Sequence, residues 1–92
     1  MSSLISMKNI GKEIAIKLES VNIDSPEKLI KLGAEKSFLM LKESYPKICL
    51  VYLYVLYGAI ADIEYTKIPD ERKKQLKEFS DSLKNIKQSK VI

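Results

Sequence analysis

The chain has 92 residues, of which 46% are hydrophobic and 30% charged, with a formal net charge of +4 and no histidine. This length and balance predict one globular domain rather than a long disordered chain. Because histidine is the usual general base and the commonest metal ligand, its absence excludes most enzyme classes. We expect no catalytic residue, no metal site and no cofactor.

A single cysteine, Cys49, rules out an internal disulfide. The first residues, MSSLISMKNIG, lack the basic region and the long apolar stretch of a secretion signal. We therefore expect a cytoplasmic protein. Because Cys49 lies in an apolar run, it is predicted to be a small buried hydrophobe. The alternative is a redox-sensitive thiol at the start of a helix.

The N-terminal part of the chain predicts a short turn and then a helix over residues 11–21. Residues 1–3 are expected to fray. The apolar residues of the turn, which can pack onto the core, are Leu4, Ile5 and Met7. The apolar stripe of the helix, spaced at i, i+4 and i+7, is Ile14, Leu18 and Val21.

Two further helices are predicted before the middle of the chain. The second begins at Ser25 and Pro26, which suit the N-cap and the first helical position. It stops at Gly33, which can adopt the left-handed conformation that ends helices. The third covers residues 34–44 and ends at the step from Tyr45 to Pro46. Its inward residues are predicted to be Phe38, Leu39 and Leu41.

The rest of the chain is arranged around residues 48–63, where 14 consecutive residues, from Ile48 to Ala61, carry no charge. A membrane span needs about 20 apolar residues, and a usual strand is shorter than this run. We therefore predict a buried central helix and no membrane contact. One broad face holds the larger residues, and the opposite stripe consists of Val51, Val55, Gly58 and Asp62.

A helix that is apolar nearly all round is enclosed by other helices or leaves one stripe for a second chain. A protein partner or a homodimer is therefore expected to contact Val51 and Val55. All five tyrosines lie on or beside the same helix, and Tyr54 and Tyr57 are assigned to this interface. The alternative is that the tyrosines are core rings whose hydroxyls reach the edge.

A fifth helix is predicted to open at Pro69, Asp70 and Glu71, and residues 87–92 are predicted to form a frayed tail. Its narrow apolar seam is Leu76, Phe79, Leu83 and Ile86. The basic residues expected toward water are Arg72, Lys73, Lys74, Lys77 and Lys84. Residues 66–92 hold eight basic and four acidic side chains, an excess that would assist contact with nucleic acid or an acidic protein.

One short pattern has a chemical rationale for binding. A glycine turn that feeds a helix leaves backbone N–H groups free, and two lysines beside it would help to hold a phosphate. The residues of this hairpin are Lys8, Asn9, Ile10, Gly11 and Lys12. The pattern resembles the hairpin of helix-hairpin-helix DNA-binding domains, with asparagine in place of the first glycine. We expect the turn to be kept, because asparagine tolerates positive φ. The alternative is a simple helix entry with Ile10 in the core.

Taken together, these segments resemble the C-terminal domain of bacterial competence regulators of the TfoX/Sxy type. The resemblance spans about Leu4 to Leu83, with Tyr65 where tryptophan is expected. The segments that carry it are Asn9-Ile10-Gly11-Lys12, Leu29, Leu32-Gly33-Ala34-Glu35-Lys36-Ser37-Phe38, Leu53-Tyr54-Val55-Leu56-Tyr57-Gly58-Ala59-Ile60, Ile68-Pro69 and Arg72-Lys73.

This resemblance implies an all-α domain of five helices, related to helix-hairpin-helix folds, in a regulator that works alongside a transcription activator. It supplies no catalytic residues. We expect residues 1–92 to form one stand-alone copy of the domain. Two functions stay open: a non-enzymatic module that binds a protein partner, such as a transcription regulator, and sequence-independent binding of the DNA backbone through Asn9 to Lys12.

Overall fold

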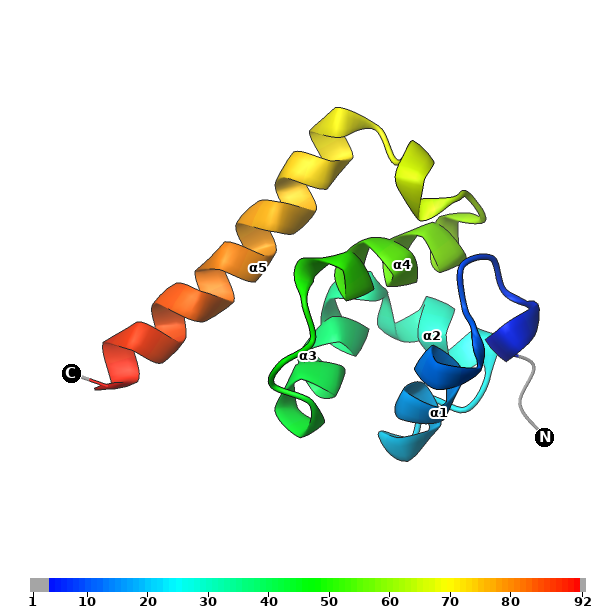
Figure 1. The fold of residues 1–92 in the computed structure, drawn as a ribbon, viewed down its shortest axis with the longest axis horizontal. Helices are drawn as coiled ribbons and strands as arrows, with labels where there is room; N and C mark the ends of the chain where they lie inside the picture. The colour runs from blue at the N-terminus through cyan, green and yellow to red at the C-terminus, as the bar shows by residue number, and fades with distance from the viewer. Residues whose placement is uncertain (1–3, 92) are drawn as a thin grey trace.

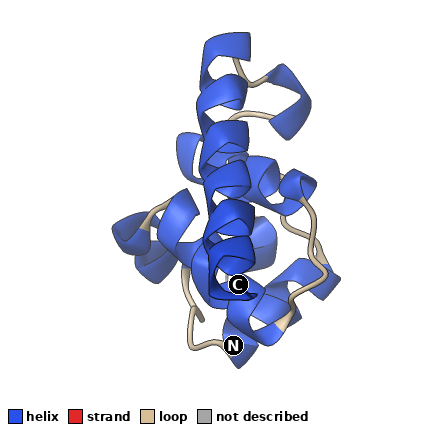
Figure 2. Cartoon of the chain, turned by 90° about the vertical axis from the view of Figure 1, so that its left-hand side faces the viewer, coloured by secondary structure: helices blue, strands red, loops and turns tan. Residues whose placement is uncertain are grey.

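The computed structural model describes the backbone of residues 4–91 and the side chains of residues 4–83. Over the described backbone the chain is helical and contains no strand (Figure 2). The all-α prediction is therefore confirmed. The elements are η1 (Leu4–Ser6), α1 (Lys12–Ser20), α2 (Pro26–Leu32), α3 (Ala34–Ser44), α4 (Leu50–Ala61), η2 (Tyr65–Lys67) and α5 (Asp70–Val91).

Helix α4 is the centre of the molecule and lies between α1, α2 and α3 on one side and α5 on the other (Figure 1). Its residues Leu53 and Leu56 are fully buried. Burial of large aliphatic side chains is the main stabilising contribution in a domain of this size. The other large side chains buried with them come from every earlier element or its flanking loop: Leu4, Leu18, Ile23, Leu29, Phe38 and Leu41.

Helices α2 and α3 meet at one residue. The Ser25 hydroxyl accepts a hydrogen bond from the Lys28 backbone N–H (3.2 Å), and Pro26 occupies the first position of α2, as predicted. Gly33 follows α2 and precedes α3 directly, with a φ of 87° and a ψ of 162°. The predicted positive φ is present, but ψ is extended rather than helical, so the chain turns sharply into α3.

Three predicted core residues are exposed instead. Ile5 is 55% exposed, because it follows buried Leu4 directly and points the other way. Leu39 is 38% exposed, since it lies about 100° from Phe38 and about 200° from Leu41 around the α3 axis. Cys49 is exposed, because it is the extended N-cap residue of α4 and not part of the helix. The prediction of a buried cysteine was wrong.

Helix α5 runs to Val91 and so includes most of the segment that was predicted to be a frayed tail. Neither glycine nor proline interrupts this segment, and it is rich in the strong helix formers lysine, glutamate, glutamine and leucine. Leu76 is buried where α5 passes α4, and the C-terminal part of α5 reaches beyond the other helices (Figure 1). Residues 1–3 and 92, and the side chain of Ile86, lie outside the described residues.

Candidate functional site

In the predicted hairpin Asn9 has the positive φ that its residue type favours, and the side chains of Asn9 and Ile10 are used by the fold. Asn9 has a φ of 73°, and Ile10 is only 5% exposed. The Asn9 Nδ2 donates a hydrogen bond to the Ile63 carbonyl (2.9 Å), and its Oδ1 accepts one from the Tyr65 backbone N–H (3.3 Å). Asn9 therefore links the N-terminal turn to the segment after α4, and its side chain is not available to a ligand.

A glycine of α4 completes this link. A Cβ atom placed on Gly58 would lie 2.5 Å from Asn9 Nδ2 and 2.7 Å from the Ile63 carbonyl oxygen. Only a residue without a side chain allows the turn to approach α4 so closely. The sequence signal for this contact was an isolated glycine inside an apolar helix.

The outer residues of the hairpin are exposed. Lys8 and Lys12 both face solvent, and the N-cap residue Gly11 gives α1 no side-chain hydrogen bond. The first N–H groups of α1 therefore lack a cap, although Glu13 adds a negative charge to the same turn. The structure thus keeps Lys8, Gly11 and Lys12 together at the start of α1, while Asn9 and Ile10 have structural roles.

The two valines of the predicted interface stripe of α4 differ in their exposure to solvent. Val51 is 45% exposed, whereas Val55 is 5% exposed and offers no surface to a partner. Tyr54 and Tyr57 are half-buried. Each ring lies below a cation of α5: Lys73 Nζ is 6.0 Å from the centre of the Tyr54 ring, and the Arg72 guanidinium is 5.6 Å from that of Tyr57. Such contacts hold a cation over an aromatic face.

Three adjoining cavities lie in a row, and two of them are lined by Tyr57 and Arg72. A cavity of about 370 Å³ lies between the α2–α3 junction, α4 and α5. It shares Leu32 and Lys36 with a cavity of about 400 Å³ on one side, and Tyr57, Arg72 and Gln75 with one of about 230 Å³ on the other. We call this surface the basic groove; its polar and charged lining residues are Lys28, Lys31, Glu35, Lys36, Tyr57, Glu71, Arg72 and Gln75.

Few of the charges in the basic groove are neutralised within the chain. Lys28 pairs with Asp24 at 3.0 Å, and the hydrogen bond and charge of Lys28 lower the pKa of the Asp24 carboxyl. The Arg72 guanidinium donates a hydrogen bond to Gln75 Oε1 (2.6 Å) while it stacks on Tyr57. This combination fixes the position of the guanidinium in the groove.

A fourth cavity, of about 500 Å³, lies on another face. It is lined by the loop from Tyr45 to Cys49 and by Lys17 and Tyr52. The Tyr45 hydroxyl shares a hydrogen bond with the Ser20 hydroxyl (2.7 Å).

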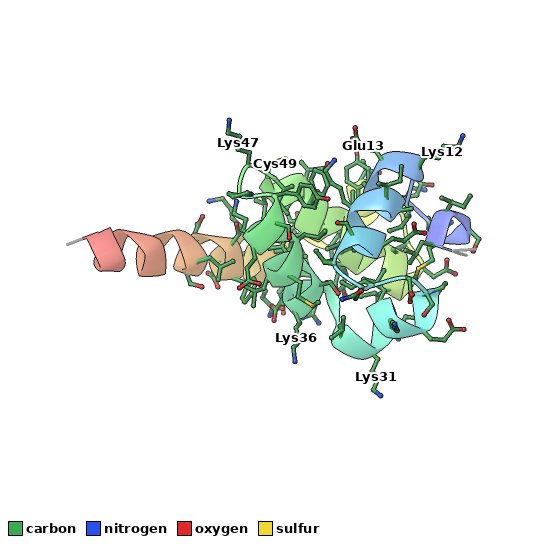
Figure 3. All side chains as sticks on the ribbon, turned by 90° about the horizontal axis from the view of Figure 1, so that it is seen from below. Lys12, Glu13, Lys31, Lys36, Lys47 and Cys49 are labelled. Atoms are coloured by element: carbon green, nitrogen blue, oxygen red, sulfur yellow. The ribbon has the colours of Figure 1, made fainter. Side chains whose placement is uncertain are left out.

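Lys47, Cys49 and Lys12 project on one side of the molecule, and Lys31 and Lys36 project on the opposite side (Figure 3).

The described residues contain no group of three histidine, cysteine, aspartate or glutamate side chains placed to hold a metal ion. Within the same part of the chain, no helix combines the length and the apolar character that crossing a membrane requires.

Residues 1–80 match the family model of the TfoX C-terminal domain. Two crystal structures are similar over most of the chain. An uncharacterized protein from Listeria monocytogenes, in a triclinic form, is 32% identical with a TM-score of 0.86, over 88% of this chain and 92% of that one. A protein of unknown function from Listeria monocytogenes, in a tetragonal form, is 32% identical with a TM-score of 0.84, over 86% and 98%. No curated protein matches the chain.

Proposed function

Because the chain belongs to the TfoX C-terminal domain family, we propose that it is a non-enzymatic regulatory module that acts by binding another protein. The proposed partner is a transcription regulator, and a second copy of this chain is the alternative. The observation that carries the proposal is the surface of α4 beside α5. There Val51 is exposed, and Tyr54 and Tyr57 are half-buried beneath cations.

The composition of this surface supports the proposal. Tyrosine and arginine are enriched where proteins bind one another, because a rigid ring or a planar guanidinium buries a large area with little loss of conformational freedom. Val51 supplies an aliphatic contact beside them. The two structural neighbours are themselves of unknown function, so the support comes from this surface and from the family.

The test is capture of partners from a cell extract with the tagged chain and with Val51→Asp. We expect a defined protein to be retained by the parent and lost with the variant, because a charge at an interface centre is strongly unfavourable. Ile16→Asp, which changes an exposed isoleucine of α1, is the matched control and should retain the protein. Light scattering of the purified chain detects a homodimer. A monomer whose captured proteins are the same with Val51→Asp would contradict the proposal.

The second candidate function is sequence-independent DNA binding at the start of α1. It is favoured by the uncapped N–H groups after Gly11 and by the exposure of Lys8 and Lys12. Fluorescence anisotropy of a labelled duplex, at low and near-physiological salt, tests it. Binding that weakens steeply with salt and disappears in Lys12→Glu would establish this function, because phosphate contacts release counterions. No binding at low salt would exclude it and leave the protein-binding module.

A further inference from the structure

Three of the four cations of the basic groove form no ion pair within the described residues and can meet an acidic ligand. Among residues with described side chains, the ion pairs involve Lys28, Lys67 and Lys77, so none neutralises Lys31, Lys36 or Arg72. These three cations come from α2, α3 and α5 and line cavities that share residues. A line of unpaired positive charges along a hollow is the electrostatic complement of a chain of carboxylates.

The groove also has an apolar floor. Leu32 and the ring of Tyr57 are half-buried and line the central cavity, so both offer apolar surface to a ligand. Leu76 also lines this cavity, but it is only 3% exposed. A ligand that only carried charge would leave this floor in contact with water. A ligand with an apolar side chain between its acidic groups would cover it.

Two carboxylates in the same groove favour a protein ligand over nucleic acid. Glu35 lines the central cavity and Glu71 lines the cavity that follows it. A phosphate backbone carries a negative charge at every nucleotide and would bring some of them close to these carboxylates. A peptide varies along its length and can place neutral or basic residues opposite Glu35 and Glu71.

We propose that the basic groove binds an acidic segment of a partner protein, with an apolar side chain of that segment against Leu32 and Tyr57. The inference rests on the proposed function, because it specifies the chemistry of the partner and the surface that receives it. Arg72 is held over Tyr57 by stacking and by its hydrogen bond to Gln75, so the main cation is already in place before binding.

The experiment is a nuclear magnetic resonance titration of the ¹⁵N-labelled full chain with a capped oligoglutamate peptide that carries one central leucine. We expect the backbone amide signals of Gly33, Lys36, Tyr57 and Gln75 to shift, and those of Gly11 and Lys12 to stay. The same peptide with glutamine in place of glutamate should cause no shift. Binding should weaken as salt is added, because the contacting charges are exposed.

Variants then locate the site. Lys36→Gln combined with Arg72→Gln should weaken binding about tenfold, since each exposed ion pair contributes modestly. Arg72→Lys keeps the charge and should retain most of the affinity, which separates loss of charge from damage to the fold. Lys12→Gln combined with Lys47→Gln removes the same charge from the opposite side and should leave the affinity unchanged (Figure 3).

Two outcomes overturn the inference. One is that the glutamate peptide does not bind, or binds equally to both double variants; if Val51→Asp still loses its captured protein, the proposed function stands without this groove. The other is that duplex DNA displaces the peptide and loses affinity with the same groove variants, which would assign the groove to nucleic acid. If neither the peptide nor a Val51-dependent protein binds, both proposals fall.

Discussion

The side chain of Asn9 links the N-terminal turn to the segment after α4. Its two hydrogen bonds reach Ile63 and Tyr65, residues 54 and 56 positions away, and its φ of 73° is disfavoured for most side chains. Asparagine suits both demands, because it tolerates positive φ and offers a donor and an acceptor on one short side chain. Its conformation and its contacts are therefore coupled.

We expect Asn9→Ala to destabilise the protein more than Asn22→Ala. Asn22 also has a positive φ, of 69°, but is exposed and has no side-chain hydrogen bond in the described structure. Alanine at either site would meet the strain of positive φ, about 1–2 kcal/mol. Only Asn9→Ala would also lose two hydrogen bonds, one of them partly buried and the other exposed, a further loss of about 1–3 kcal/mol. Chemical denaturation measures the difference, and equal losses would show that the hydrogen bonds contribute nothing.

Gly58 is expected to tolerate alanine poorly, although alanine is the better helix former. The added Cβ would collide with the Ile63 carbonyl oxygen, which is backbone and cannot rotate away. We expect Gly58→Ala to lower the free energy of unfolding by about 1–3 kcal/mol. Gly11→Ala is the control, because no atom lies within 4 Å of its Cβ position, and its loss should stay below about 1 kcal/mol. A stabilised Gly58→Ala variant would mean that the turn does not pack here.

For single residues, the sequence predicted backbone conformations better than it predicted hydrogen-bond partners. The positive φ of Asn9 and Gly33 followed from residue type alone. The contacts of Asn9 did not, because its partners lie 54 and 56 residues away and one of them is a backbone carbonyl. The exposure of Cys49 was missed for a similar reason: an apolar neighbourhood in sequence does not show where a helix begins.

Among the elements, α4 combines a buried face with an exposed one. Leu53 is fully buried, whereas Val51, two residues earlier, is 45% exposed. Residues two apart on a helix point about 200° from each other, which places them on nearly opposite sides. The sequence left two alternatives, a fully enclosed helix and one with an uncovered stripe. The exposure of Val51 fits the second alternative, whereas Val55 of the same predicted stripe is buried.

We expect Leu53→Ala to lower the free energy of unfolding by about 2–5 kcal/mol, the usual range for a buried leucine. Val51→Ala, on the exposed side of the same helix, should change it by about 0.5 kcal/mol or less. Urea unfolding followed by circular dichroism measures both. A loss well below about 1 kcal/mol for Leu53→Ala would show that α4 is not the centre of the core.

The limits of the helices were largely predictable, because their signals are local. Ser25, Pro26, Gly33 and the Tyr45-Pro46 step each act within a residue or two of themselves, and the observed α2 and α3 follow them. The end of α5 has no such signal. Its outer part contains no glycine or proline that would mark where the helix stops.

For the whole molecule, the absence of histidine predicts a stability that is nearly constant between about pH 6 and 7.5. At acid pH the stability of the fold changes because carboxylates become protonated. Because Lys28 lowers the pKa of Asp24 in the folded state, the ion pair stabilises the fold above the unfolded pKa of about 3.9. That contribution is lost as the pH falls through the folded pKa.

Thermal unfolding at a series of pH values tests this expectation. The parent should show a flat melting temperature near neutrality and a decline in acid, and Asp24→Asn should remove a small part of the decline. A transition centred between about pH 6 and 7 would contradict it, because no side chain of this composition titrates there without a large shift.

The basic groove belongs to the whole molecule and could not be predicted from the sequence. Its cations lie on three helices, and only the packing of α5 across α4 brings Arg72 to the side of Lys36. The sequence did indicate that the C-terminal segment is basic and that Tyr57 belongs to a binding surface. It could not join those two observations, because nothing local relates residue 57 to residue 36 or 72.

The Asn9 link has a further consequence for the order in which the chain folds. Its hydrogen bonds close a loop of 54 residues, whereas α2 and α3 meet across a single residue. Closing a long loop is entropically unfavourable until the intervening helices are in place. We therefore expect the Asn9 contacts to be absent from the folding transition state. Asn9→Ala should then accelerate unfolding and leave the refolding rate nearly unchanged. The contacts of this asparagine would therefore contribute mainly to the kinetic stability of the protein, by slowing its unfolding.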